Sequence, residues 1–310
     1  MTEDSKPEAN ANPFNPYHGR FESYHRLPSK GRDNDDIFQE LSGMADEENR
    51  SWRSGQTSGT FYHAGDEHRA FLNKIFALYS HVNVLQVDIC PSMSKFESEI
   101  VSMTAKMLNG DAVKDKIPDD EVCGTVTFGG SESIMMAMKV YRDRARMEMG
   151  ITTPEIIIPH TAHPAFDKAG EYFGIKIVHA PTPAPDFRVD LNAVKRLINT
   201  NTVALVGSAG NYPYGLIDPL EDLSDLALKH DLGLHVDGCL GGFILPWAEK
   251  LGYPIPVFDF RLPGLTSMSA DTHKYGYAAK GTSVVMYRGK ELRHFQFYTV
   301  TDWPDRKSVV

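Results

Sequence analysis

The chain has 310 residues, of which 41% are hydrophobic, so it can bury a substantial core and is expected to be globular. Its formal net charge of −9 argues against a nucleic-acid surface, because phosphate backbones are held by clustered Lys and Arg. Three scattered cysteines form neither a disulfide framework nor a paired metal-ligand pattern, which favours the reducing cytoplasm. No apolar run approaches the roughly 20 residues that span a bilayer, so we expect a soluble protein without a membrane-spanning segment.

The N-terminal part is polar. Residues 1 to about 35 contain few apolar residues and many Pro, Asn, Asp and Gly, so they cannot bury enough surface to offset the entropy of ordering. We therefore assign residues 1–60 to a polar tail or arm.

Two helices are expected next. Apolar residues recur at helical spacing between residues 66 and 79, namely Phe71, Ile75 and Leu78. Ser94 followed by Glu97 is a capping-box pattern, which predicts that a second helix begins at Ser94.

After residue 121, short apolar strands alternate with amphipathic helical stretches. The expected strands cover residues 122–128, 155–159, 175–180, 203–207, 233–237, 265–270 and 282–287. The helical stretches begin near Ser131, Phe166, Asp190 and Asp222. This alternation of β-branched runs with helices predicts an α/β fold with a mainly parallel, seven-stranded sheet covered on both faces. Ligands in such sheets bind at the carboxyl ends of the strands.

A glycine-rich turn joins the strand at 122–128 to the helix that follows. Gly129 and Gly130 let backbone approach an anion, and the free amides at the helix start, including that of Ser131, attract phosphate. Alone, such a turn is more often an ordinary tight turn. The Gly-Lys-Ser/Thr ending of a Walker loop is absent from it.

His235 and Asp237 end a strand and share one of its faces. An aspartate there can pair with a protonated pyridine nitrogen and keep that ring an electron sink, as in pyridoxal-phosphate chemistry. Alternatively, Asp237 caps the loop that begins at Gly238. His235 and Asp237 could also bind a metal with His160 and His163, but no further Cys, His or carboxylate spacing completes a four-ligand set, so we expect no metal.

Lys274 follows the strand at 265–270. A lysine that binds pyridoxal phosphate must lie beside a strand end and be partly shielded, so that its amine can be neutral and nucleophilic. Most lysines are solvated surface groups. Lys274 differs because it lies between His273 and Tyr275 in a segment of small and polar residues, with no helical face around it.

In combination, these motifs resemble the fold-type I pyridoxal-phosphate enzymes of the group II decarboxylase kind and, more closely, the sphingosine-1-phosphate lyase family in its bacterial and fungal forms. The stretches that carry the resemblance are 58–63 (SGTFYH), 124–133 (GTVTFGGSES), 161–168 (TAHPAFDK), 235–243 (HVDGCLGGF) and 269–281 (SADTHKYGYAAKG). The resemblance runs from about residue 25 to Trp303.

The resemblance implies a role for several residues. Lys274 is implied as the Schiff-base lysine of pyridoxal 5′-phosphate, with Asp237 on the pyridine nitrogen and His163 over the ring. Gly130, Ser131 and His273 are implied around the cofactor phosphate, and Tyr62 and Lys280 near the phosphate of the substrate. Where the family has Leu-His before an acidic residue, this chain has Gln86, which can donate a hydrogen bond but cannot titrate.

The resemblance also implies the organisation of the chain. Residues 61–298 correspond to the cofactor-binding large domain of the aspartate-aminotransferase-like fold, and residues 299–310 to a tail where the family continues into a small domain. We therefore expect the small C-terminal domain to be missing and the turnover of the chain to be low.

The implied reaction is the carbon–carbon cleavage of a phosphorylated sphingoid base, in sphingolipid metabolism, to a fatty aldehyde and phosphoethanolamine by a homodimer. One alternative is a pyridoxal-phosphate-dependent amino-acid decarboxylase. Another is a non-catalytic, dimer-forming fragment. For localisation, the alternative to the cytoplasm is a longer eukaryotic form associated with the endoplasmic reticulum membrane.

Overall fold

The computed structural model describes residues 17–55, 57, 59–113 and 121–300. The chain divides into two compact units, Met1–Phe61 and Tyr62–Val310, which are described separately. Residues 1–16 of the expected N-terminal tail, Ser58 and residues 301–310 of the expected C-terminal tail lie outside the described residues.

The first unit contains the helix α1 (Asn34–Arg53), which the sequence analysis did not predict. Asp33 caps it by accepting a hydrogen bond from the amide of Asp35 at 2.9 Å. Acidic residues in the first turn and basic residues in the last turn interact favourably with the helix dipole. None of its residues is buried, and its apolar residues at helical spacing, such as Ile37 and Leu41, remain exposed, so capping and charge placement favour this helix.

The second unit is built on one seven-stranded sheet in the order β1-β7-β6-β5-β4-β2-β3. Its strands are β1 (Val122–Thr127), β2 (Glu155–Pro159), β3 (Lys176–Ala180), β4 (Thr202–Ser208), β5 (Gly233–Asp237), β6 (Ser267–Ala270) and β7 (Ser283–Arg288). Only β7 runs against its neighbours, and the remaining pairs are parallel. The mainly parallel, seven-stranded sheet expected from the sequence is confirmed.

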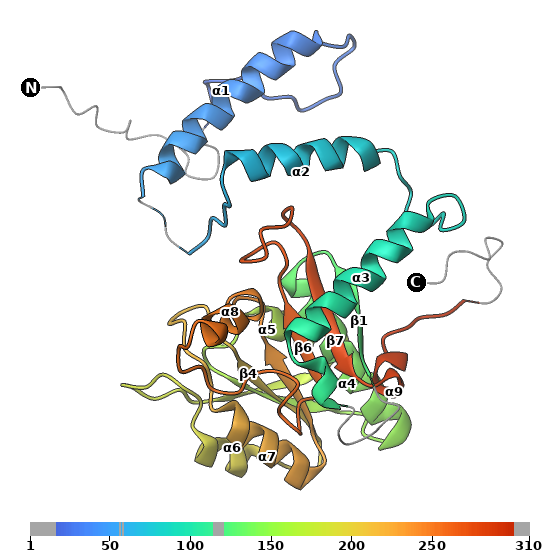
Figure 1. The fold of residues 1–310 in the computed structure, drawn as a ribbon, viewed down its shortest axis with the longest axis vertical. Helices are drawn as coiled ribbons and strands as arrows, with labels where there is room; N and C mark the ends of the chain where they lie inside the picture. The colour runs from blue at the N-terminus through green and yellow to red at the C-terminus, as the bar shows by residue number, and fades with distance from the viewer. Residues whose placement is uncertain (1–16, 56, 58, 114–120, 301–310) are drawn as a thin grey trace, which may run out of the picture. The chain divides into compact units, whose positions relative to one another are not determined.

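Helices cover both faces of this sheet (Figure 1). The helices of this unit are α2 (Asp66–Tyr79), which has no buried residue and lies off the sheet, α3 (Pro91–Met107), α4 (Gly130–Glu148), α5 (Ala165–Phe173), α6 (Leu191–Leu197), α7 (Leu220–His230), α8 (Leu245–Lys250) and α9 (Lys290–His294), with short 3-10 turns at Gly110–Val113 and Gly241–Phe243. Among the described residues, no helix combines the length and the apolar character that crossing a membrane requires.

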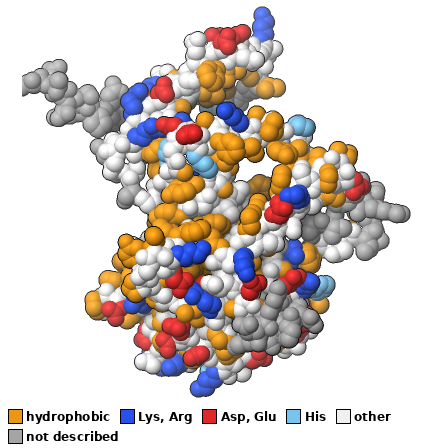
Figure 2. All heavy atoms as spheres, viewed as in Figure 1, with side chains coloured by type: hydrophobic (Ala, Val, Ile, Leu, Met, Phe, Trp, Pro, Cys, Tyr) orange, Lys and Arg blue, Asp and Glu red, His pale blue; other side chains and the backbone are white. Residues whose placement is uncertain are grey.

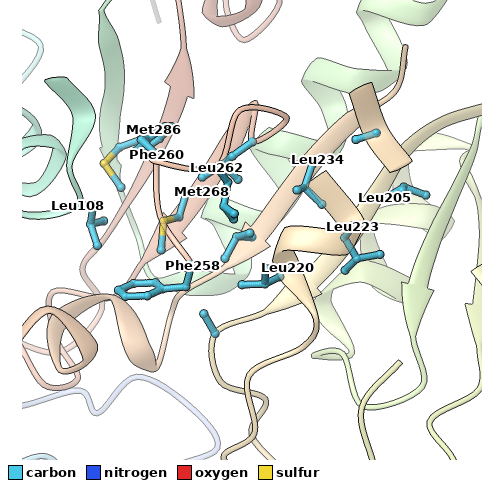
Figure 3. Packing of buried hydrophobic residues seen from close by; sticks show 14 of the residues in the cluster. Leu108, Leu205, Leu220, Leu223, Leu234, Phe258, Phe260, Leu262, Met268 and Met286 are labelled. Atoms are coloured by element: carbon cyan, nitrogen blue, oxygen red, sulfur yellow. The ribbon is translucent and has the colours of Figure 1, made fainter. Parts of the chain in front are cut away.

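Alternate side chains of the strands pack into two separate hydrophobic cores, one on each face of the sheet. On β7, Val284 and Met286 face the layer with α3 and α7, whereas Val285 and Tyr287 face the layer with α4 and α5. The first layer packs leucines of α7 and the loop residues Phe258 to Leu265 against β4, β5 and β6 (Figure 3). Both faces of the strands are therefore apolar, which explains their continuous hydrophobic runs.

The start of α3 differs from the expected one. The helix begins at Pro91, which is pre-organised for the first helical position, so Ser94 lies inside the first turn and is not the cap. Glu97 instead bonds to β1: its carboxylate accepts hydrogen bonds from the Thr125 hydroxyl at 2.5 Å and the Val126 amide at 3.0 Å. The capping-box prediction was wrong because the proline overrode it.

The helix expected over residues 66–79 is present as α2, yet its apolar face is not covered in this chain. Phe71 is 57% exposed and Leu78 is 64% exposed, and Ile75 also remains accessible. Exposed apolar side chains at helical spacing are typical of a surface that packs against another protein segment.

Candidate functional site

The expected site residues lie where the parallel strands end. Gly129 and Gly130 follow β1, Asp237 is the last residue of β5, and Asp271 directly follows β6. A Cβ atom added to Gly130 would lie 2.7 Å from Asp271 Oδ1 and 2.8 Å from the Cys239 sulfur. The start of α4 therefore approaches the ends of β5 and β6 so closely that only glycine fits.

Lys274 is partly buried and forms an ion pair. Its Nζ lies 2.8 Å from Asp271 Oδ2, and the two side chains are 21% and 2% exposed. Burial alone lowers the pKa of Lys274, but the neighbouring Cys239, Asp271 and Asp237 raise it by more, so the net pKa is raised. The adjacent carboxylate favours the ammonium form, so Lys274 must lose a proton before it can act as a nucleophile.

Asp237 uses one carboxylate oxygen to hold its own loop. Its Oδ1 accepts hydrogen bonds from the Cys239 amide at 3.0 Å and the Ser269 hydroxyl at 3.3 Å. Oδ2 accepts none from any residue that the structure describes. Asp237 thus caps the loop after β5, as the structural alternative required, and keeps its second oxygen for a ligand.

His235 lies beneath this site and is fully buried. Its Nδ1 lies 2.7 Å from the Ser267 hydroxyl, and Nε2 lies 3.4 Å from the hydroxyl of Ser269, which also contacts Asp237. Burial lowers the pKa of His235 to about 4, so the ring is neutral at pH 7. In the described part of the chain, no group of three His, Cys, Asp or Glu residues could hold a metal ion.

The burial of His235 makes folding sensitive to acid. The pKa of His235 in the folded protein, about 4, lies below the ordinary value of 6.5. The unfolded chain therefore binds a proton at His235 more readily, so the free energy of unfolding is highest above pH 6.5 and falls as the pH is lowered towards 4. The shift corresponds to about 3 kcal/mol. Asp218, whose pKa burial raises to about 6, acts in the opposite direction over the same range.

We therefore expect His235→Asn to lose less stability than the unmodified protein between pH 7 and pH 4.5, measured by urea denaturation at each pH. The difference between the two proteins cancels Asp218 and other shared groups. Parallel pH profiles for the two proteins would contradict a neutral, buried His235.

The start of α4 offers unpaired amides. Gly129 has a φ of 97°, which glycine tolerates, and its carbonyl accepts hydrogen bonds from the amides of Glu132 and Ser133. The amides of Gly130 and Ser131 donate to no acceptor among the described residues. This helix start therefore keeps two donors and a positive dipole end for an anion.

His273 lies beside that helix start. A Cβ on Gly129 would be 3.9 Å from His273 Cε1. The Nδ1 of His273 lies 2.6 Å from the carbonyl of Thr282, and because a carbonyl only accepts, Nδ1 must carry the proton. This bond fixes the ring and leaves Nε2 for another partner.

Tyr62 and Lys280 also come together near Lys274. The ring of Tyr62 packs edge-on against Tyr275 at 5.2 Å, and Lys280 Nζ lies 4.8 Å from the Tyr62 ring centre and 3.2 Å from the carbonyl of His273. Burial and the charge of Lys274 lower the pKa of Lys280, and burial raises that of Tyr62. Tyr62 thus packs against the segment that carries His273, Lys274 and Lys280.

His163 and Gln86 are less closely tied to this group. The Nδ1 of His163 accepts a hydrogen bond from the Ala165 amide at 3.1 Å, and the residue is exposed after β2. Gln86 forms a turn through its backbone, with its amide bonded to the Asn83 carbonyl at 3.0 Å. Within the described residues, no hydrogen bond, ion pair or ring contact joins either side chain to Lys274 or Asp237.

Several polar atoms at this edge were missed by the sequence analysis. Four buried ones have no hydrogen-bond partner among the described residues: Thr161 Oγ1, Ser208 Oγ, Asn211 Nδ2 and Asp271 Oδ1. Each belongs to the end of β2, β4 or β6 or to the loop that follows it. An unpaired buried polar group costs about 1–3 kcal/mol, so these residues fit a polar ligand bound across the strand ends. The signal that could have found them is their position after an apolar strand.

The fold and the site define a class of protein. Residues 18–300 match the sequence model described as the pyridoxal-dependent decarboxylase conserved domain. The chain therefore belongs to the pyridoxal-dependent decarboxylase family, whose cofactor is pyridoxal 5′-phosphate. The free oxygen of Asp237, the amides at the start of α4 and the buried amine of Lys274 fit that group.

Individual relatives narrow the comparison within this family. The chain is 46% identical over 282 residues to sphingosine-1-phosphate lyase of Dictyostelium discoideum, which covers 91% of this chain and 52% of that protein. It is 50% identical over 256 residues to the lyase of Oryza sativa subsp. japonica, covering 82% and 47%. It also matches the structure of Burkholderia pseudomallei sphingosine-1-phosphate lyase with a TM-score of 0.91 and 50% identity, covering 93% and 66%. The chain thus spans about half the length of the curated relatives it matches.

Proposed function

We propose that the protein is a pyridoxal-phosphate-dependent carbon–carbon lyase that cleaves a phosphorylated sphingoid base to a fatty aldehyde and phosphoethanolamine. The observation that carries the proposal is the buried amine of Lys274 beside Asp237, whose Oδ2 is open to a ligand. The identity to sphingosine-1-phosphate lyases supports the choice of substrate.

In this proposal, the residues at the strand ends hold the cofactor. Lys274 would bind it covalently, Asp237 Oδ2 would accept a hydrogen bond from its protonated ring nitrogen, and His163 would stack on its ring. The amides of Gly130 and Ser131 and the Nε2 of His273 bind its phosphate. When bound, the cofactor delocalises the electron pair that cleavage leaves on the amine-bearing carbon.

The substrate phosphate is proposed to lie at Tyr62 and Lys280. An ammonium over an aromatic ring is partly desolvated, and it then attracts a phosphate more strongly than a solvated lysine does. Gln86 is the further residue that we propose for the substrate region, where its amide can donate a hydrogen bond without carrying charge.

The competing candidate is an amino-acid decarboxylase, which uses the same cofactor site. We expect the protein, loaded with pyridoxal phosphate, to release aldehyde from sphinganine 1-phosphate and no carbon dioxide from amino acids. Aldehyde is measured by trapping with a hydrazine reagent, and carbon dioxide by release from carboxyl-labelled amino acids. Carbon dioxide without aldehyde would favour the decarboxylase. Cofactor binding with neither product would favour a non-catalytic fragment.

The assembly and the setting of the protein are also proposed. We infer a homodimer, because α2 leaves Phe71, Phe76 and Leu78 exposed. No disulfide bond joins the described cysteines, which supports a cytoplasmic location. On the part of the surface visible in Figure 2, acidic and basic side chains are interspersed rather than gathered by sign. Light scattering on the eluting protein would test the dimer.

A further inference from the structure

Asp271 is a buried carboxylate that faces the amine of Lys274. The residue is 1% exposed, its Oδ2 lies 2.8 Å from Lys274 Nζ, and its Oδ1 has no hydrogen-bond partner within the described residues. The backbone closes the same turn, since the Lys274 amide donates to the Asp271 carbonyl at 3.3 Å. A carboxylate this deeply buried is costly unless it is paired, so the pair is held as a unit.

The start of α4 fixes the position of this carboxylate. A Cβ on Gly130 would lie 2.7 Å and 2.8 Å from its two oxygens. Backbone at the start of α4 therefore packs directly against Asp271. The carboxylate cannot move far from Lys274.

The other ionisable groups that face Lys274 act less directly. Asp237 favours its charged form from the end of β5, whereas burial raises the pKa of the nearby Cys239 thiol, which therefore carries no charge at neutral pH. Lys280 and Tyr62 lie on the other side, where Lys280 opposes a second positive charge. Of these groups, Asp271 alone forms an ion pair with Lys274 in the described structure.

We propose that Asp271 is a positioning residue that sets the pH at which Lys274 becomes reactive, and so controls when the chain binds its cofactor covalently. This inference rests on the proposed role of Lys274. The ammonium of Lys274 first loses one proton, to Asp271 Oδ2 and from there to water. The freed electron pair then forms the bond from Nζ to the aldehyde carbon of pyridoxal phosphate, and the aldehyde oxygen leaves as water with the two remaining amine protons. No oxidant or reductant is required.

Asp271→Asn is expected to move this pH dependence. The amide has nearly the shape of the carboxylate but no charge, so burial acts on Lys274 with less opposition. An adjacent opposite charge shifts a pKa by about 1–3 units, so the midpoint of Lys274 reactivity should fall by at least about one pH unit. At a pH below the midpoint, each pH unit by which the midpoint falls raises the rate of reaction of Lys274 about tenfold.

The test first measures the reactivity of Lys274 in the absence of the cofactor. The full chain, stripped of pyridoxal phosphate, is labelled briefly with acetic anhydride across a pH series, and the acetylated fraction of Lys274 is measured by mass spectrometry. The exposed Lys290 is the internal reference. The matched control is Asp259→Asn, which removes another buried carboxylate, one that pairs with Arg261 rather than Lys274. Asp271→Glu, which keeps the charge, should restore a high midpoint.

The same series is then repeated with pyridoxal phosphate, trapped with borohydride. A lowered midpoint in Asp271→Asn, in acetylation and in trapping, supports the inference. If the acetylation midpoint falls but no cofactor is trapped on Lys274, the result supports the role of Asp271 and contradicts the proposed function. If Asp271→Asn fails to fold, Asp271→Ser replaces it. A folded variant whose acetylation midpoint equals that of the unmodified protein overturns the inference.

Discussion

Replacing Lys274 by alanine is expected to abolish covalent binding of pyridoxal phosphate, so that borohydride leaves no cofactor on residues 269–281. The reason is geometric: Lys274 Nζ lies at the strand ends beside Asp237, where the cofactor ring is proposed to bind. The competing amine is that of Lys280, whose pKa is lowered by burial and by the charge of Lys274. Peptide mapping of the reduced protein measures which lysine carries the label.

The matched control for this experiment is Lys280→Ala. It should keep the label on Lys274 in full, because Lys280 lies over Tyr62 and not at the end of β5. The loss of turnover in Lys274→Ala should be complete within the detection of the aldehyde assay. A label on Lys280 in the unmodified protein would show that local pKa, rather than position, selects the lysine.

The sheet could be predicted from the sequence because its strands are apolar on both faces. Each expected strand lies within about two residues of the observed one, since β-branched runs between turn residues leave little choice. Helix α1 was missed because the polar composition around it favours a tail, although Ile37, Leu41 and Met44 recur there at helical spacing. The start of α3 was misplaced because Ser94 and Glu97 form a capping pattern that Pro91 makes unnecessary.

The site was predictable where a residue's neighbours in sequence are also its neighbours in space. His273 and Lys274 fall on one turn after β6, and Asp237 ends β5, so strand ends and spacing located them. The ion pair of Asp271 with Lys274 could not be predicted in the same way. It depends on how deeply the turn is buried and on the approach of Gly130 from α4, neither of which spacing shows. The charge of Lys274 depends on these contacts, so sequence spacing alone does not show it.

The second large effect is expected for Asp237→Asn, which should keep the fold and the covalent cofactor but lower the turnover about 100-fold. An asparagine oxygen can still accept hydrogen bonds from the Cys239 amide and the Ser269 hydroxyl, so the loop after β5 should stay in place. The group that replaces Oδ2 is then an NH₂ group, which donates and cannot accept a hydrogen bond from the protonated ring nitrogen.

The size of that effect follows from the charge that is removed. A hydrogen bond to a charged group is worth about 1.5–3 kcal/mol, and each 1.36 kcal/mol of transition-state stabilisation is about tenfold in rate. Borohydride trapping at Lys274 should be unchanged while aldehyde release falls, which separates loss of chemistry from loss of binding. The control is Asp167→Asn, which removes an exposed carboxylate paired with His179 and should leave both measurements unchanged. Near-normal aldehyde release by a folded, cofactor-loaded Asp237→Asn protein would reduce Asp237 to a cap of the loop after β5.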